Sequence, residues 1–253
     1  MITRKSKREI EKMQKAGDLL VKTHKEIAKM IKPGITTKEI DTFVEEFLAK
    51  HGATPEQKGY NGYPFAICAS INDEICHGFA RDEPLKNGDI VTIDMVVNLD
   101  GGLADSAWTY AVGDVDEKGL RLMEVTKESL YKGIEQAQVG KRIGDIGHAI
   151  QTYAEGEGFS VVRDFTGHGI GPTIHEDPHI PHFGLPNKGL RLKEGMVITI
   201  EPMLNEGAWQ SKMDANNWTA RTIDGSRSAQ YEHTIVITKD GPLILTDQDK
   251  VEE

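Results

Sequence analysis

Apolar residues recur at every third or fourth position in four segments of the chain, and a glycine follows each segment. Pro33-Gly34 closes the first segment, and Thr36 or Thr37 is suited to cap the start of the second. A period of about 3.6 residues is typical of amphipathic helices, so we expect four of them. The segments are Ile10–Ile31, Ile40–Phe47, Lys118–Ala137 and Ile143–Glu157.

An apolar strand that ends in a carboxylate occurs twice in the chain. Residues 86–94 read KNGDIVTID and residues 193–201 read KEGMVITIE, an offset of 107 residues (201 minus 94). We therefore expect a single domain over 1–253 built from two related halves, roughly 1–110 and 111–253, each with two helices followed by strands. Chance similarity is the alternative, because K-x-G followed by β-branched residues is common.

Four acidic residues stand at unusual positions in the predicted strands. Asp94 ends one strand and Asp105 follows the predicted hairpin turn at 100–102, so their carboxylates belong to adjacent antiparallel strands. Glu201 is the counterpart of Asp94 in the second half, and Glu232 interrupts a β-branched run. Burying such groups is costly unless a cation or a donor satisfies them, although a solvated hairpin end would also explain Asp94 and Asp105.

Two histidines lie in a glycine-rich segment, where the backbone can approach a ligand closely. His168 follows Gly167, and histidine is the commonest nitrogen ligand of first-row metals, although a buried and hydrogen-bonded histidine is the alternative. Residues 175–179 read H-E-x-x-H, the helical zinc-protease motif. Pro178 lies inside this motif and disfavours a helix, so we reject the zinc-helix interpretation.

The candidate ligands are four carboxylates and one imidazole, without a thiolate. This set suits Mn, Fe(II), Co or Zn rather than Cu(I) or an iron–sulfur cluster. Four acids around one cation would leave a negative site, so we expect two divalent metal ions, about 3.5 to 4 Å apart, sharing a bridging water. The predicted ligands are Asp94, Asp105, His168, Glu201 and Glu232.

Composition and charge limit the classes of molecule that the chain is expected to bind. The chain has 30 Lys and Arg against 40 Asp and Glu, and a net charge of -10 disfavours specific nucleic-acid binding or an anionic membrane. Cys68 and Cys76 are too few for a disulfide framework, and no stretch approaches a membrane span, so we expect a cytoplasmic protein. We also expect it to be a monomer. The basic cluster Arg4–Arg8 fits either a transient ribosome contact or the solvated start of a helix.

Six motifs occur along the chain in a characteristic order. They are GYNGYP at 59–64, SINDEICHG at 70–78, GDIVTID at 88–94, GHGIG at 167–171, IEPM at 200–203 and QYEHT at 230–234. Each alone is weak, but in this order and spacing they resemble the type I methionine aminopeptidases over nearly the whole chain. The resemblance implies the pita-bread fold, an α+β architecture in which two pseudo-symmetric αβ halves with antiparallel strands enclose a dinuclear metal site.

The resemblance also implies a role for each candidate ligand. Asp105 and Glu232 would bridge the two ions. Asp94 would complete the coordination of one ion, and His168 with Glu201 that of the other.

The implied reaction removes the N-terminal methionine from nascent proteins and peptides when the second residue is small. We expect attack by a metal-bridging hydroxide, with Glu201 accepting and returning the proton. His77 and His175 would contact the scissile peptide, and His175 would stabilise the developing oxyanion. The methionine pocket, whose residues would also suit an ordinary core, would comprise Tyr60, Tyr63, Cys68, Ile174 and Trp218.

Three positions depart from the pattern of familiar bacterial members. Ile174 stands where we expect Phe, Asn61 where we expect His, and Asn216-Asn217 where we expect Asp-Gly. These differences bear on the shape and selectivity of the pocket and leave the metal ligands untouched. The chain lacks the zinc-binding extension of eukaryotic type I enzymes and has no room for the type II helical insertion, which indicates a bacterial-type enzyme.

Two other functions fit the same fold. A proline-directed peptidase would carry a large N-terminal domain, whereas 93 residues precede Asp94 here. A catalytically inactive pita-bread protein that binds peptides would have lost metal ligands, whereas this chain keeps all five.

Overall fold

The computed structural model describes residues 2–249, and the four predicted helical segments all form α-helices in it. Ser6 and Thr36 cap the first two helices, and each forms a reciprocal capping box with a glutamate three residues later. The helices are α1 (Lys7–Met30), α2 (Thr37–Lys50), α3 (Glu117–Glu135) and α4 (Ile143–Gly156), and a 3-10 turn, η1, spans Tyr60–Gly62.

The strands form four sheets with orders β1-β4-β2 (β5 also pairs with β4), β13-β10-β6, β11-β12-β3 and β15-β14-β9-β7-β8. The strands of the first half are β1 (Ala53–Pro55), β2 (Cys68–Ile71), β3 (Glu74–Cys76), β4 (Ile90–Leu99) and β5 (Gly102–Ala111). Those of the second half are β6 (Ser160–Val161), β7 (Gly167–Gly169), β8 (Glu176–Ile180), β9 (Val197–Ile200), β10 (Met203–Asn205), β11 (Ser211–Met213), β12 (Ala220–Thr222), β13 (Ser228–Gln230), β14 (His233–Thr238) and β15 (Gly241–Ile244).

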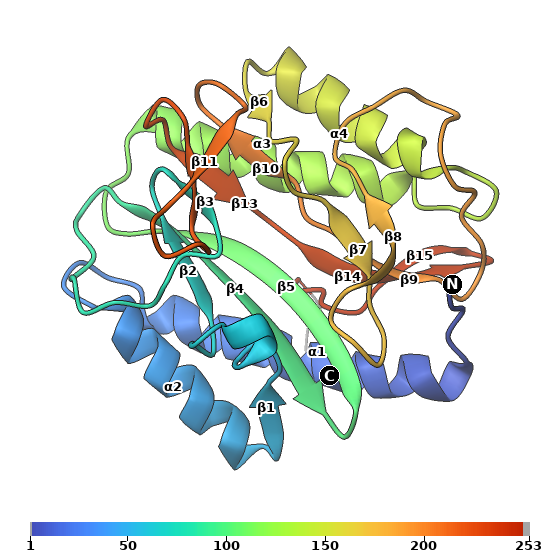
Figure 1. The fold of residues 1–253 in the computed structure, drawn as a ribbon, viewed down its shortest axis with the longest axis horizontal. Coiled ribbons are helices and arrows are strands. Elements are labelled where there is room, and N and C mark those ends of the chain that lie inside the picture. Colours follow the sequence, from blue (N-terminus) through green and yellow to red (C-terminus); the bar gives the residue numbers. More distant parts are fainter. Residues whose placement is uncertain (1, 250–253) are drawn as a thin grey trace.

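The helices lie on the outer faces of the sheets (Figure 1). Helix α1 packs on β4 and β5, and with α2 it covers the first sheet through a core that includes Leu20, Ile40 and Ile93. Helices α3 and α4 pack against each other and cover the strands of the second half, with Ile146 and Ile198 in their shared core. The two helical layers therefore leave the inner faces of the sheets turned toward each other.

The hairpin predicted from the sequence is confirmed. Leu99 pairs with Gly102, so the turn consists of Asp100 and Gly101, which both adopt positive φ values (51° and 78°). In this register Val96 lies opposite Asp105. Because side chains alternate along a strand, Asp94, two residues before Val96, shares a face with Asp105.

The other acidic positions lie beside strands rather than inside them. Glu201 follows the last residue of β9, and Glu232 lies between β13 and β14, where the chain passes from one sheet to another. The predicted β-branched run around Glu232 is thus broken at the glutamate, whose N–H donates to Ala107 O (2.9 Å). The zinc-helix interpretation is rightly rejected, because residues 176–180 form strand β8.

A membrane-spanning helix is absent from residues 2–249, where none is both long enough and apolar enough.

Candidate active site

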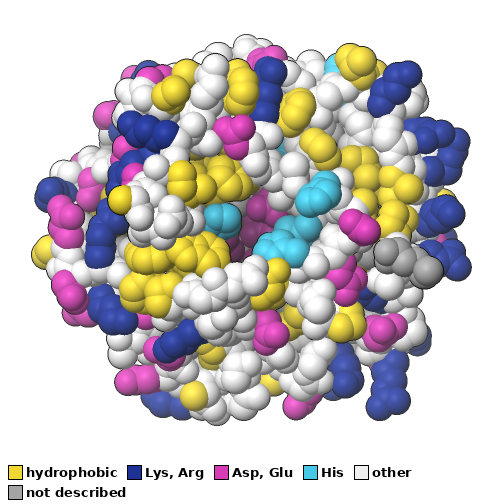
Figure 2. Space-filling model, in the orientation of Figure 1, with side chains coloured by type: hydrophobic (Ala, Val, Ile, Leu, Met, Phe, Trp, Pro, Cys, Tyr) yellow, Lys and Arg dark blue, Asp and Glu magenta, His cyan; other side chains and the backbone are white. Residues whose placement is uncertain are grey.

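A cavity of about 570 Å³ opens between the two halves. Figure 2 shows it as a hollow with carboxylates at its floor, histidines at its border and apolar side chains beside it. All twelve side chains predicted from the sequence line it: Tyr60, Tyr63, Cys68, His77, Asp94, Asp105, His168, Ile174, His175, Glu201, Trp218 and Glu232. Residues far apart in the chain are thus gathered around one space.

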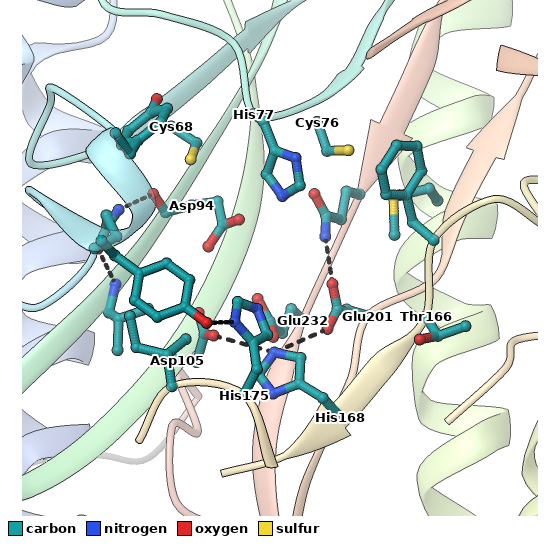
Figure 3. Close-up of a pocket in the computed structure, with 18 of the residues that line it drawn as sticks. Cys68, Cys76, His77, Asp94, Asp105, Thr166, His168, His175, Glu201 and Glu232 are labelled. Carbon is teal, nitrogen blue, oxygen red and sulfur yellow. Dashed lines mark hydrogen bonds and ion pairs between the residues drawn. The ribbon is translucent and has the colours of Figure 1, made fainter. Parts of the chain in front are cut away.

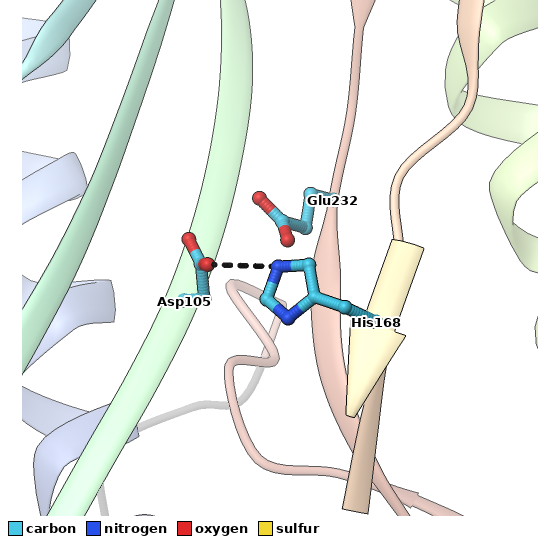
Figure 4. Close-up of side chains that lie close together, drawn as sticks. All are labelled: Asp105, His168 and Glu232. Atoms are coloured by element: carbon cyan, nitrogen blue, oxygen red, sulfur yellow. Dashed lines mark ion pairs between the residues drawn. The ribbon is translucent and has the colours of Figure 1, made fainter. Parts of the chain in front are cut away.

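Three of the predicted ligands converge most closely. Asp105, His168 and Glu232 each offer an atom within 4.8 Å of the others, and their exposed fractions are 5%, 7% and 1% (Figure 4). Asp105 comes from β5, His168 from β7, and Glu232 from the β13–β14 connection. The group therefore draws on both halves of the chain.

The other two predicted ligands border this group. Glu201 Oε1 lies 3.5 Å from His168 Nε2, and Asp105 Oδ2 lies 3.6 Å from the same nitrogen. Asp94 lies on the same face of the β4–β5 hairpin as Asp105, and the two carboxyl groups influence each other's ionisation. Five donor side chains thus form one continuous cluster.

Burial raises the pKa values of the four carboxyl groups in the cluster, and neighbouring acids add to this effect for three of them. Burial raises the pKa of Asp94 to about 7, and burial together with the Asp94 charge raises the pKa of Glu201 to about 8. Burial, then the neighbouring acids, raises the pKa values of Asp105 and Glu232 well above their usual range. Burial lowers the pKa of His168 to about 3, which keeps the imidazole neutral and able to bind a metal.

The cluster fits divalent cations on its own chemistry. Asp105 Oδ1 and Glu232 Oε1 are buried and have no hydrogen-bond partner among residues 2–249. Buried carboxylate oxygens without partners are costly, and a cation among them would satisfy them and favour their charged forms. The oxygen and nitrogen donors suit hard or borderline divalent ions.

Two buried threonines hold the predicted ligands in place. Thr199 Oγ1 accepts the His168 N–H (3.0 Å) and donates to Glu201 Oε1 (2.8 Å). Thr234 Oγ1 accepts the Asp105 N–H (3.0 Å) and donates to the Asp105 carbonyl (2.8 Å). Sequence reasoning missed both, although Thr199 lies two residues before Glu201, the spacing that places side chains on one face of a strand.

A buried histidine, His182, hydrogen-bonds to the backbone of Glu201, the predicted proton acceptor. His182 is fully buried, and its Nε2 accepts the Glu201 N–H (3.1 Å). Burial lowers the pKa of His182 to about 3, consistent with an Nε2 that carries no proton. His182 gave no signal in the sequence because its partner lies 19 residues away.

The two histidines predicted to contact substrate lie on opposite sides of the cavity (Figure 3). His175 Nδ1 lies 3.0 Å from Tyr60 Oη, and its ring centroid is 4.4 Å from that of His168. His77 has a positive φ of 56°, and burial followed by the His175 charge lowers its pKa to about 4. Both rings face the space above the carboxylates.

The predicted methionine pocket adjoins the carboxylates directly. Cys68 pairs with Asp94 across β2 and β4, and both Cys68 and Ile174 are buried. Tyr63 Oη donates to the carbonyls of Ile67 and Gly78, and its ring meets Trp218 edge-on at 5.0 Å. Further lining residues that the sequence did not reveal are Gln57, Phe165, Met203 and Gln230.

Known proteins resemble this chain along nearly its whole length. The profile of metallopeptidase family M24 matches residues 11–239. Methionine aminopeptidase 1 of Bacillus subtilis is 53% identical over 246 residues, which cover 97% of this chain and 99% of that protein. The crystal structure of methionine aminopeptidase from Rickettsia prowazekii superposes with a TM-score of 0.96 at 46% identity, covering 98% of this chain and 100% of that one.

A prolidase is a more distant match. The prolidase of Pyrococcus horikoshii reaches a TM-score of 0.78 at 25% identity, and the match covers 98% of this chain but only 64% of the prolidase. This chain therefore belongs to metallopeptidase family M24 and, within it, to the methionine aminopeptidases.

Proposed function

We propose that this methionine aminopeptidase removes N-terminal methionine at the cluster on the cavity floor, where five side chains bind two divalent ions. The observation that carries the assignment is the pair of buried, unpartnered oxygens, Asp105 Oδ1 and Glu232 Oε1, within a cluster of four acids. Bound divalent ions supply Lewis-acid polarisation and water activation. The ligands are Asp94, Asp105, His168, Glu201 and Glu232.

Glu201 is the residue placed to move a proton. Its carboxylate accepts hydrogen bonds from Thr199 (2.8 Å) and Gln230 (3.3 Å), and these bonds fix the orientation of the group. We assign Glu201 the acceptance of a proton from the attacking water and its return to the leaving amine. A fixed carboxylate suits both transfers, because each requires its oxygen to lie within hydrogen-bond distance of the group that gives or takes the proton.

His175 and His77 bind the scissile peptide in this proposal. Tyr60 engages Nδ1 of His175, which leaves Nε2 to donate to the carbonyl oxygen as negative charge develops on it. His77 faces the same space from the opposite wall. The methionine side chain lies against Tyr63, Cys68, Ile174 and Trp218, a wall of aromatic, aliphatic and sulfur atoms.

The test is release of free methionine from a Met-Ala-Ser peptide by metal-reconstituted protein, with a Xaa-Pro peptide alongside. His168→Ala and Glu232→Ala should each bind fewer metal ions and lose activity. His179→Ala is the matched control, since His179 lies at the exposed border of the same cavity and is no proposed ligand. Full activity in excess chelator, after analysis shows a metal-free protein, would contradict the assignment, and preferred cleavage of the proline peptide would contradict the function.

The finer predictions about partners and location belong to the same proposal. We propose that the enzyme acts as a cytoplasmic monomer on nascent chains, with a transient ribosome contact. Sedimentation of the protein alone tests the oligomeric state, sedimentation with ribosomes tests the ribosome contact, and cell fractionation tests the location. The metal used in the cell is one of Co, Mn, Fe or Zn, and its availability decides among them.

A further inference from the structure

The segment before α1 is anchored to the second half of the chain. The Lys5 N–H donates to the Gly195 carbonyl (2.6 Å), in the turn before β9. From this anchor the side chains of Thr3 and Lys5 reach the start of β8. The first residues of the chain thus touch the strand that follows the predicted catalytic histidine, His175.

Lys5 is buried, which is unusual for a lysine. Its side chain is 3% exposed, and its Nζ donates to Glu176 Oε2 (2.7 Å) and to Thr3 Oγ1. Thr3 Oγ1 also donates to Glu176 Oε2 (3.1 Å). A buried ammonium is costly unless it is paired, so the carboxylate of Glu176 is what permits Lys5 to occupy this position.

Lys5 contacts the connection between β7 and β8 at two points. One is Glu176, the residue after His175, and the other is Gly171, where an added Cβ would lie 2.5 Å from Lys5 Cε. These contacts lie at the beginning and the end of residues 171–176. A restraint on the Glu176 carboxylate therefore restrains the backbone that carries His175.

We propose that Lys5 is a positioning residue for catalysis: its ion pair with Glu176 fixes residues 171–176 and holds His175 against the scissile peptide. This inference rests on the role proposed above for His175. The basic residues of the cluster Arg4–Arg8 would then have different roles. Lys5 is buried and positions a catalytic residue, whereas Arg4, Lys7 and Arg8 are exposed.

The test compares Lys5→Met with Lys12→Met under metal-saturated conditions. Lys12 is a matched control because it lines a small cavity together with Lys5, but its side chain is exposed and, among residues 2–249, donates a hydrogen bond to the Asp100 carbonyl alone (3.0 Å). We expect Lys5→Met to lower kcat about tenfold, because a displacement of about 1 Å at a reacting group can cost up to about 100-fold. KM for Met-Ala-Ser and the bound metal should stay at the values of the unmutated enzyme, and Lys5→Arg should restore most of kcat.

A second comparison shows whether Lys5 acts through His175. In a His175→Ala background, Lys5→Met should cause no further loss of kcat, because the group that it positions is gone. Glu176→Gln keeps the shape of the glutamate but removes its charge, and it should lower kcat as much as Lys5→Met does. This variant provides the test if Lys5→Met does not fold.

Three results would overturn the inference: an unchanged kcat in folded Lys5→Met, loss of bound metal in that variant, or an equal loss of kcat in the His175→Ala background. An unmutated enzyme that releases no methionine would instead refute the proposed function. The two failures are therefore distinguishable.

Discussion

Replacing Thr199 by valine would test how one strand residue holds two proposed metal ligands. Thr199 is fully buried, and its hydroxyl joins the His168 N–H to the Glu201 carboxylate. Valine has almost the same shape and lacks the hydroxyl. The substitution therefore removes both hydrogen bonds while it leaves the packing of β9 unchanged.

The expected magnitude follows from these two bonds. A buried N–H left without an acceptor costs about 1 to 3 kcal/mol, so the free energy of unfolding should fall by about 2 kcal/mol. The Thr199 hydroxyl lowers the pKa of Glu201, so its loss should raise that pKa further and let protons compete better with metal. A charge-assisted bond is worth about 1.5 kcal/mol or more, which corresponds to roughly tenfold weaker metal binding at neutral pH.

Calorimetric metal titration at two pH values, together with kcat at saturating metal, measures these effects. Thr199→Ser keeps a hydroxyl and should bind metal like the unmutated protein. Thr126→Val is the matched control for stability, because Thr126 is equally buried but its hydroxyl, within residues 2–249, bonds to the Leu122 carbonyl of α3 alone. If Thr199→Val binds metal as tightly as Thr199→Ser, the reasoning is wrong.

Three further predictions follow from the site. His175→Ala should keep its metal but lose about 100-fold or more in kcat, because an interaction made mainly in the transition state is removed; a metal-free variant would place His175 among the ligands. Peptides starting Met-Ala should be cut at least about 100-fold faster than those starting Met-Leu, because Phe165 meets His77 edge-on at 5.7 Å and narrows the cavity, and equal kcat/KM values would refute this gate. The folded-state pKa values of Asp94 and Glu201 are raised, so the folded protein retains protons that the unfolded chain releases. The free energy of unfolding of the metal-free protein should therefore fall from pH 6.5 to 8 by up to about 1.4 kcal/mol per pH unit for each group. Denaturant melts that show a rise over this range would contradict the sign.

Local signals made much of the fold predictable. A threonine at position 36 or 37 predicted the start of α2, and Asp100-Gly101-Gly102 predicted a hairpin turn. Carboxylates in apolar segments predicted a cation site, because a buried carboxylate without a partner is costly. These carboxylates form the floor of the cavity. These inferences needed only neighbouring residues and the period of a strand or helix.

Contacts between distant segments were beyond such reasoning. Lys5 reads as one of several surface lysines until its partner Glu176, 171 residues away, is brought beside it. The sequence around His182 likewise gives no sign that this side chain accepts the Glu201 N–H. Glu232 lies among the predicted ligands, but it does not lie inside a strand as predicted, because the passage from β13 to β14 depends on a hydrogen bond to β5. The duplication of the two halves stays a prediction.

The division of the cavity between the halves has a consequence for engineering. On the proposed assignment, Asp94 and Asp105 come before the connection from β5 to α3, which is exposed at Gly113, Asp114 and Asp116, and His168, Glu201 and Glu232 come after it. Metal ions bound by ligands from both halves would hold the two halves together. A chain cut within residues 112–116 would then make a split enzyme whose two fragments assemble when metal is supplied and separate when a chelator takes it away.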